Sequence, residues 1–297
     1  MALKNMFQAM RKEGYITRPL DEFLLKEANK DNDRAINVNA PSCAGRCNRA
    51  NYYMRKQYQS DGTVDPRTLR IFNNGDHVHV RLQTYLEEMG MLICDELPLI
   101  NEEYNIQGHT DGFLDLDDLE EVAILEIKSI NDNQFQQLKD AKSEHKQQGL
   151  VYVFCAEERR KYLHKTYPTK EEFRKSQPER EEYFKSKYQH LKGGRKHSKE
   201  EKIQHQVDLH LIEDDVLYDT HKPVTKVIFL YENKNNQELK EYCVERNTTT
   251  ENILTETLER FTDLNDFVER EELPPREGTK SSQTCRWCNF KNQCFIV

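Results

Sequence analysis

The sequence has no apolar run approaching the length of about 18 residues that a membrane-spanning helix needs. It also lacks a Gly-x4-Gly-Lys-Ser/Thr loop, which excludes the phosphate-cradling motif of P-loop motor proteins. Residues 1–7 contain neither the apolar stretch nor the small-residue cleavage site of a secretory signal. We therefore expect a cytoplasmic protein without membrane association, in the host cytoplasm if the gene is viral.

An excess of positive charge is missing as well. The chain of 297 residues carries 44 Lys and Arg against 52 Asp and Glu, a formal net charge of −8. This balance excludes a uniformly basic coat, so any contact with a nucleic acid has to be local. Apolar residues make up only 36% of the chain and charged residues 32%, which predicts a core surrounded by much solvated helix.

One segment departs from this acidic average. Residues 157–202 hold 15 Lys and Arg against 9 Asp and Glu, a local excess of +6. Such a charged stretch is typical of a solvated helical hairpin. The alternative is a clamp on a phosphate backbone, in which aromatic rings offer stacking faces. The candidate rings are Tyr162, Tyr167, Tyr183 and Tyr188.

The remaining pattern is that of an α/β domain. Three apolar strand patterns follow one another with short connections, which predicts an antiparallel meander. These strands are expected over residues 92–100, 104–116 and 122–130. A second strand pair is expected over 224–231 and 238–244. Apolar residues at helical spacing predict helices over 20–28, 70–88, 135–154 and 252–269.

Asp111, Glu126 and Lys128 stand at neighbouring strands of this meander. Side chains alternate along a strand, so Glu126 and Lys128 share one face while Ile127 points to the core. Asp111 on the adjacent strand can meet Glu126 across the pair. Two close carboxylates repel unless a cation lies between them, which favours a magnesium or manganese site that activates a water. The alternative is a surface ion pair between Glu126 and Lys128.

Residues upstream and downstream can reach the same place. His79 lies in the expected helix before the strands and can bind a metal as a neutral imidazole, with His77 and His109 as competing choices. Gln148 and Tyr152 are four residues apart, so they share one face of the helix after the strands. There they can position a substrate or the attacking water.

The eight cysteines fall into two groups. Cys94, Cys155 and Cys243 lie singly in apolar runs, and we expect them to be small core residues. Three others form the compact cluster Cys285-x2-Cys288-x5-Cys294 near the C-terminus. A fourth thiolate, from Cys47 or Cys43, would complete a tetrahedral zinc site or an iron–sulfur cluster.

Taken in order, these motifs resemble the RecB-type branch of the PD-(D/E)xK nucleases. The resemblance rests on His79, Asp111, Glu126-x-Lys128 and Gln148-x3-Tyr152. Ser42-x4-Cys47-x-Arg49 and the C-terminal cysteines are similar to elements of the family's iron–sulfur members, which include CRISPR-associated exonucleases and viral relatives. Thr110 departs from the family pattern, which has an apolar residue before the aspartate.

The resemblance implies an α/β, restriction-endonuclease-like core. In this fold a mixed central sheet is flanked by helices, here with a charged helical insertion and a cysteine-cluster staple. The implied organisation is an N-terminal helical extension (1–41), the first part of the nuclease core (42–155), the insertion (156–222), and the second part of the core with the C-terminal cysteines (223–297).

The resemblance also implies roles for the site residues. The side chains of His79, Asp111 and Glu126, with the Ile127 carbonyl, bind Mg²⁺ or Mn²⁺. Lys128 is the catalytic lysine beside the two carboxylates, and Gln148 and Tyr152 complete the catalytic site. A structural 4Fe–4S cluster, with zinc as the alternative, is held by Cys47, Cys285, Cys288 and Cys294.

The implied function is that of a metal-dependent DNA exonuclease acting on single-stranded DNA or DNA ends in recombination, repair or replication. Any unwinding comes from a helicase or recombination partner, since the chain has no motor motif. The polar composition and lysine-rich insertion would suit a phage or mobile-element enzyme. The alternatives are an endonuclease on the same fold and a non-catalytic nucleic-acid-binding adaptor with a structural cluster.

Overall fold

A computed structural model describes residues 15–28, 37–62, 64–116, 121–192 and 197–296. The part of the expected N-terminal extension that falls on 1–14 and 29–36 lies outside these residues, as does much of the acidic turn after the second expected strand. Among the helices of the described ranges, none is long and apolar enough to cross a membrane.

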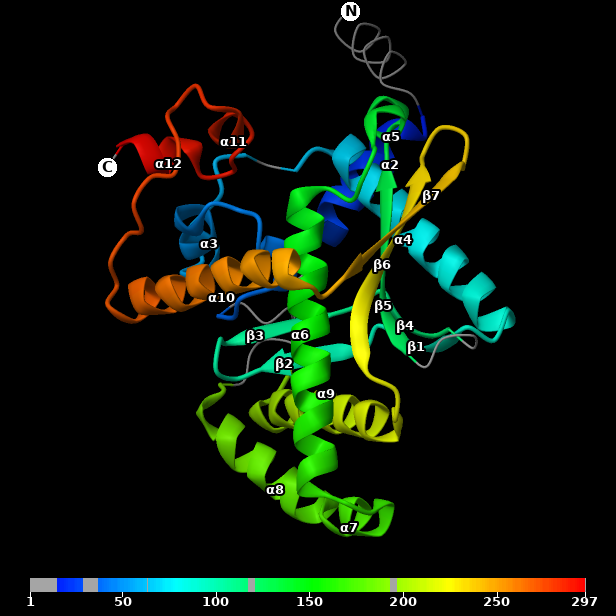
Figure 1. The fold of residues 1–297 in the computed structure, drawn as a ribbon. Helices are drawn as coiled ribbons and strands as arrows, with labels where there is room; N and C mark the ends of the chain where they lie inside the picture. Colours follow the sequence, from blue (N-terminus) through cyan, green and yellow to red (C-terminus); the bar gives the residue numbers. More distant parts are fainter. Residues whose placement is uncertain (1–14, 29–36, 63, 117–120, 193–196, 297) are drawn as a thin grey trace, which may run out of the picture.

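A mixed five-stranded sheet forms the centre of the molecule (Figure 1). Its strand order is β1-β4-β5-β6-β7. All neighbours are antiparallel except β5 and β6, which run parallel. The strands are β1 (Leu92–Asp95), β4 (Gly112–Asp115), β5 (Val122–Ile130), β6 (Val224–Asn233) and β7 (Leu239–Glu245).

The first two strands of the predicted meander are each divided into two shorter strands. The expected strand 92–100 is divided into β1 and β2 (Pro98–Asn101), and the expected strand 104–116 is divided into β3 (Ile106–His109) and β4. β2 and β3 pair with each other as a separate two-stranded sheet, and Ile106 of β3 also forms an isolated parallel bridge with Asn39. Glu96 causes the first break, because its φ of 44° is in the left-handed region that a strand does not use.

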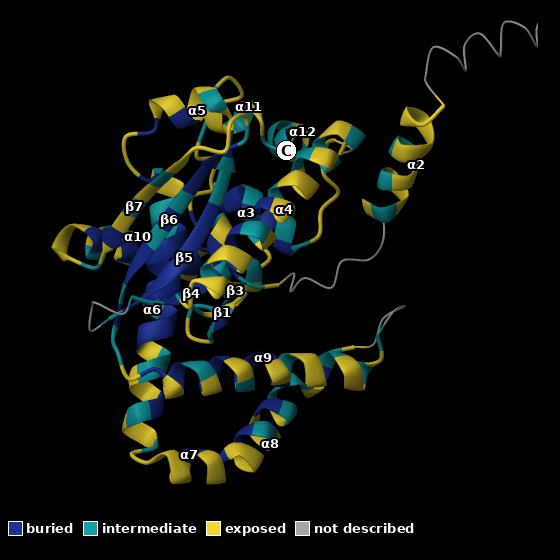
Figure 2. Ribbon diagram, turned by 90° about the vertical axis from the view of Figure 1, so that its right-hand side faces the viewer, coloured by how far each residue is buried: buried dark blue, intermediate teal, exposed yellow. Residues whose placement is uncertain are grey.

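Helices cover both faces of the sheet (Figure 1). One face packs against α6 (Ser143–Thr166) and α10 (Thr248–Glu269), where the largest apolar cluster lies. The other face packs against α4 (Pro66–Glu88), whose Val78 and Leu82 contact Leu125 and Ile127 of β5. β5 is therefore buried on both sides, as Figure 2 shows by its colour.

The expected single helix over 135–154 is wrong. It is two helices, α5 (Asp132–Gln137) and α6, because the carbonyl of Leu138 leaves the helical ladder. That carbonyl instead accepts hydrogen bonds from Lys240 Nζ at 3.2 Å and Tyr242 Oη at 2.8 Å. α6 then runs on to Thr166, so it continues through the expected domain boundary at 155/156.

The charged insertion is helical, and its helices pack on α6 and on one another. They are α7 (Lys170–Lys175), α8 (Gln177–Lys187), the 3-10 turn η2 (Tyr188–His190) and α9 (Lys199–Asp219). Asp214 joins α9 to α6 and α8 by ion pairs with Arg159 of α6 at 2.6 Å and Arg180 of α8 at 2.7 Å. The insertion is thus fixed to the core by a buried polar network, whereas α7 is mostly exposed (Figure 2).

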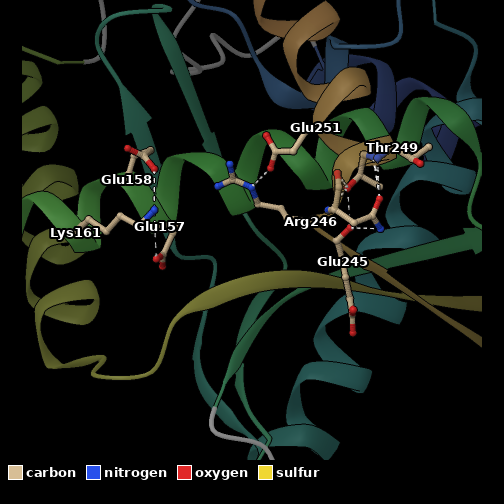
Figure 3. A network of polar contacts seen from close by, with 9 residues as sticks. Glu157, Glu158, Lys161, Glu245, Arg246, Thr249 and Glu251 are labelled. Atoms are coloured by element: carbon tan, nitrogen blue, oxygen red, sulfur yellow. Dashed lines mark hydrogen bonds and ion pairs between the residues drawn. The ribbon is translucent and has the colours of Figure 1, made fainter.

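Polar contacts also fix the elements around the start of β6 and the end of β7. Glu157 of α6 accepts a hydrogen bond from the Val224 backbone N–H at 2.9 Å, which anchors the first residue of β6. After β7, Arg246 pairs with Glu251 at 2.6 Å across the turn into α10 (Figure 3). These contacts hold α6 and α10 against the same face of the sheet.

The N-terminal part of the described chain meets the C-terminal part at α3, whereas its first helix lies beside α4 (Figure 1). The N-terminal part comprises α2 (Thr17–Ala28), the 3-10 turn η1 (Pro41–Cys43) and α3 (Asn48–Arg55), and the C-terminal part comprises α11 (Gln283–Arg286) and α12 (Lys291–Ile296). Tyr53 of α3 packs against Phe290, with ring centroids 5.5 Å apart. The backbone N–H of Asn48 donates to Glu277 at 2.7 Å.

Candidate active site

Asp111 lies at the corner where β3 ends and β4 begins. Its Oδ2 accepts a hydrogen bond from the backbone N–H of Ile127 at 2.6 Å, and its Oδ1 lies 3.1 Å from His79 Nδ1. Gly112 pairs with Leu125, so the register carries Asp111 to the level of Glu126. The strand break thereby turns the Asp111 carboxylate toward both β5 and α4.

Glu126 and Lys128 share one face of β5. Lys128 Nζ donates to Glu126 Oε2 at 2.5 Å, while no described group hydrogen-bonds the buried Glu126 Oε1. Burial, and then the charge of Asp111, raises the pKa of Glu126 to about 7. Burial alone would lower the pKa of Lys128, but the charges of Glu126 and Asp111 raise it, so the lysine is held as a cation.

His79 is the histidine that the fold brings to the corner. Burial opposes its charged form, but the hydrogen bond and charge of Asp111 outweigh burial and raise the pKa of His79. His77, two residues earlier on α4, is exposed. His109 contributes its backbone carbonyl, which accepts a hydrogen bond from Tyr152 Oη at 2.7 Å.

Gln148 and Tyr152 face the corner from α6. Both side chains are buried. Burial raises the pKa of Tyr152 well above its usual value, with further contributions from the charges of Glu126 and Asp111, so the phenol is a neutral donor near both carboxylates. Gly108 is required for this approach, because a Cβ there would lie 2.8 Å from Pro41 Cδ and 3.0 Å from Tyr152 Oη.

Two further residues belong to the corner, and sequence reasoning missed both. Gln83 Nε2 donates to the Asp111 carbonyl at 2.7 Å and lies 3.5 Å from Glu96 Oε1. Burial, and then the charge of Asp111, raises the pKa of Glu96. Gln83 follows His79 by one helical turn, which was a usable signal. Glu96 gave none, because a left-handed residue inside an apolar strand pattern has no sequence mark.

The charges at this corner fit a divalent cation. Asp111 and Glu126 face one lysine, Lys128, and Glu96 lies near Asp111. These three carboxylates and the lysine have a formal charge of −2 when all are ionised and His79 is neutral. One oxygen of Glu126 is buried and unsatisfied. Within the described ranges, no three His, Cys, Asp or Glu side chains already stand in a ligand arrangement. The donors are hard oxygens and an imidazole, which suit Mg²⁺ or Mn²⁺.

A second group of candidate ligands lies where the two chain ends meet. Cys47, Cys285, Cys288 and Cys294 line one pocket together with the cationic side chains of Arg49, Arg276 and Lys291. Burial, and then the charges of the three other thiols, raises the pKa of Cys288. The sulfur atoms converge without forming a ligand arrangement among the described residues. Glu277 also lines this pocket, so the four thiols share it with side chains of both charges.

The other cysteines are placed differently. Cys43 is in η1 and does not line the pocket; its carbonyl accepts a hydrogen bond from Asn51 at 3.1 Å. Cys155 is buried and Cys94 is partly buried against the core, as expected. The expectation for Cys243 is wrong, because this residue is exposed on β7, the edge strand, where alternate side chains face away from the core.

Comparison with known proteins gives one family. No curated protein matches the chain. Seven chains of solved structures match, among them the one titled "Crystal structure of SSO0001", which is 15% identical, covers 96% of this chain and 98% of that chain, and has a TM-score of 0.47. Residues 64–295 match the family described as the PD-(D/E)XK nuclease superfamily. The chain therefore belongs to the PD-(D/E)XK nuclease superfamily, and its mixed sheet flanked by helices is the restriction-endonuclease-like core that the sequence predicted.

Proposed function

We propose that this protein is a RecB-type, metal-dependent DNA exonuclease that hydrolyses phosphodiester bonds in single-stranded DNA or at DNA ends. The superfamily implies a nuclease that acts on a nucleic acid and typically uses Mg²⁺ or Mn²⁺. The observation that carries the proposal is the corner itself, where His79, Asp111, Glu126 and Lys128 meet from three elements and Glu126 Oε1 lacks a partner.

Each residue has a proposed role. His79, Asp111 and Glu126, with the carbonyl of Ile127, would hold the divalent cation. When bound, such a cation lowers the pKa of water and offsets charge on the phosphate. Lys128 carries its positive charge beside Glu126, where it can orient the attacking water and stabilise the charge that develops on the phosphate.

Gln148 and Tyr152 are proposed to complete the site from α6. The Tyr152 hydroxyl holds the His109 carbonyl, one residue before Thr110 and two before Asp111. A buried phenol in this place keeps the strand corner in position and excludes water from one side of Glu126. Gln148, buried one turn earlier, supports the phenol and presents an amide to the substrate.

An assay on end-labelled DNA tests the proposal. The wild-type protein with Mn²⁺ is incubated with linear and circular single-stranded DNA of one sequence, and Glu126→Gln serves as the control. We expect stepwise loss of nucleotides from the linear strand, intact circles, and no product from the variant. Cutting of circles would make the protein an endonuclease on the same fold. Absence of hydrolysis on every DNA and RNA, with folded protein, would refute the catalytic proposal in favour of an adaptor.

For the cysteine pocket we propose a 4Fe–4S cluster held by Cys47, Cys285, Cys288 and Cys294, with a structural role. The support is the convergence of these thiols between the chain ends and the cations around them. A protein with an iron–sulfur cluster absorbs visible light at about 400 nm, whereas a protein with zinc in the same place does not. We expect that absorbance in protein purified without oxygen, and its loss in Cys288→Ala. Cys43→Ala is the matched control and should keep it.

The biological setting is proposed from what the chain lacks. Its sequence has no P-loop motif, so we propose that a helicase or recombination partner supplies unwound DNA in the cytoplasm. Affinity purification of the tagged protein from cells with damaged DNA tests this partnership. Recovery of a DNA-dependent ATPase would support the partnership, and its absence from nuclease-active preparations would count against it.

A further inference from the structure

A cavity of about 790 Å³ lies between the β2–β3 hairpin and the charged insertion. One wall is the hairpin, including Gln107 of β3. The opposite wall is η2 and the first half of α9, including His190, Lys202, His205 and Gln206. The cavity exists only because the insertion packs here. Gln107 Nε2 donates to Gln206 Oε1 at 3.2 Å and joins the two walls.

β3 leads from this cavity to the active-site corner. Gln107 and His109 alternate with Gly108, so they point to the same side of β3. Asp111 is four residues beyond Gln107, at most about 13 Å along an extended chain. The cavity is therefore next to the reacting residues.

The chemistry of the walls suits nucleobases better than phosphates. Lys187 is ion-paired with Glu102, and Glu201 lies in the same wall as Lys202, so formal charges nearly cancel. What remains are amide and imidazole groups, which hydrogen-bond base edges, together with Tyr188 and apolar side chains such as Ile100 and Leu191, which pack on base faces.

The size of the cavity indicates which form of nucleic acid it can bind. A volume of 790 Å³ corresponds to a cube about 9 Å on a side, whereas the major groove of a duplex alone is about 12 Å wide. Unpaired bases fit such a space, and a duplex does not. At about 3.4 Å per nucleotide, the distance from Gln107 to Asp111 corresponds to a few nucleotides of a single strand.

We infer that this cavity binds unpaired bases of a single strand a few nucleotides from the phosphate at Asp111 and Glu126. The insertion thereby makes the enzyme selective for single strands. This inference rests on the proposed function for the identity of the cut site, but the binding itself requires no hydrolysis. It also distinguishes a specific cavity from a clamp in which every lysine of the insertion contributes equally.

Binding is measured by fluorescence anisotropy with a labelled twelve-nucleotide single strand in EDTA, so that no cleavage occurs. The test variants are Lys202→Glu and His205→Glu, which alter exposed or half-exposed cavity residues. Lys175→Glu on α7 is the matched control for Lys202→Glu, because it makes the same charge change in the same insertion outside the cavity. It makes a larger charge change than His205→Glu, so it is a stringent control for that variant as well. We expect about tenfold weaker binding for each cavity variant and no change for the control.

A second measurement keeps the inference testable if a variant is unstable. Wild-type protein is photo-crosslinked to strands with 5-iodouracil at successive positions from the end, and the labelled peptides are sequenced. Crosslinks from the positions a few nucleotides in should map to residues 187–191 or 202–206. Equal binding by all three variants, or crosslinks only elsewhere, would overturn the inference. Binding as expected with no hydrolysis in Mn²⁺ would instead remove the proposed function and leave the cavity.

Discussion

Two glutamates of this protein look alike until their surroundings are compared. Glu126 in the strand corner and Glu213 in the insertion are both buried, and for each of them one side-chain oxygen has no hydrogen-bond partner among the described residues. Burial is the first cause that raises the pKa of both, to about 7 for Glu126 and about 8 for Glu213. A perturbed pKa alone therefore does not identify a catalytic carboxyl.

The neighbouring charges separate them. Glu213 accepts a hydrogen bond from the Ile100 N–H at 2.9 Å, and the adjacent Asp214 is matched by Arg159 and Arg180. Carboxylates and cations balance there. At the corner Glu126 shares one lysine with Asp111, and Glu96 adds a third carboxylate near Asp111, which leaves a deficit of positive charge. That deficit, and not burial, indicates a place for a divalent cation.

The difference between the two glutamates is tested most directly by replacing each of them with glutamine. Glu126→Gln should lower nuclease activity by at least about 10³-fold, because it removes a ligand charge from the reacting site. Its amide oxygen can still accept from Lys128, so the fold should persist. Glu213→Gln should keep activity within about threefold. Initial rates on linear single-stranded DNA in Mn²⁺ measure both, and equal losses in two folded variants would contradict the distinction.

Removing one cationic side chain from the corner and one from the insertion tests the same difference. Lys128→Met should lower the turnover rate by about 10²-fold, because it deletes the charge that stabilises the transition state. Arg159→Met should leave that rate unchanged, since Arg180 still pairs with Asp214, but should cost about 1–3 kcal/mol of stability. Single-turnover kinetics and urea unfolding measure the two effects. A slow Arg159→Met enzyme of normal stability would argue against a purely structural network.

The pH dependence of stability should follow Glu213. In the unfolded chain this carboxyl has its ordinary pKa of 4.5, whereas in the folded protein its pKa is about 8. Between these values folding takes up a proton, so the contribution to stability is fully present below about pH 4.5 and is lost as pH rises through 8. The slope is about 1.4 kcal/mol per pH unit. Glu126, with a pKa of about 7, adds a slope of the same sign below pH 7. Glu213→Gln should therefore lower the slope measured in urea titrations from about pH 5 to pH 8 by about 1.4 kcal/mol per pH unit and leave the part due to Glu126. An unchanged slope would contradict the assignment.

Much of this arrangement was readable from sequence, for a physical reason. Strand alternation placed Glu126 and Lys128 together, and the one-turn spacing placed Gln148 beside Tyr152, because both periods are properties of the backbone. The α/β class was confirmed. The break at Glu96 was missed, since its left-handed backbone opposes the local apolar pattern and is held only by long-range contacts. For the same reason the division of α5 from α6 was missed, as it depends on hydrogen bonds from β7.

The insertion shows the other limit. Its helices were expected from composition, but the burial of Glu213 and Asp214 was not, because isolated acidic residues in a charged helix are usually solvated. Their burial is tolerated because Arg159 and Arg180, on two other helices, form ion pairs with Asp214. Sequence spacing contains no information on which of the insertion's many arginines and lysines turn inward.

The smallest expected effect concerns two tyrosines with the same kind of hydrogen bond. Tyr152 Oη donates to the His109 carbonyl at 2.7 Å, and Tyr218 Oη donates to the Tyr167 carbonyl at 2.9 Å. Tyr152→Phe and Tyr218→Phe should each cost about 0.5–1.5 kcal/mol of stability. Only Tyr152→Phe should also lower the turnover rate, by up to about tenfold, because the carbonyl that it holds is two residues from Asp111. If both variants are less stable but neither has a lower turnover rate, Tyr152 is a structural residue and does not belong to the catalytic site.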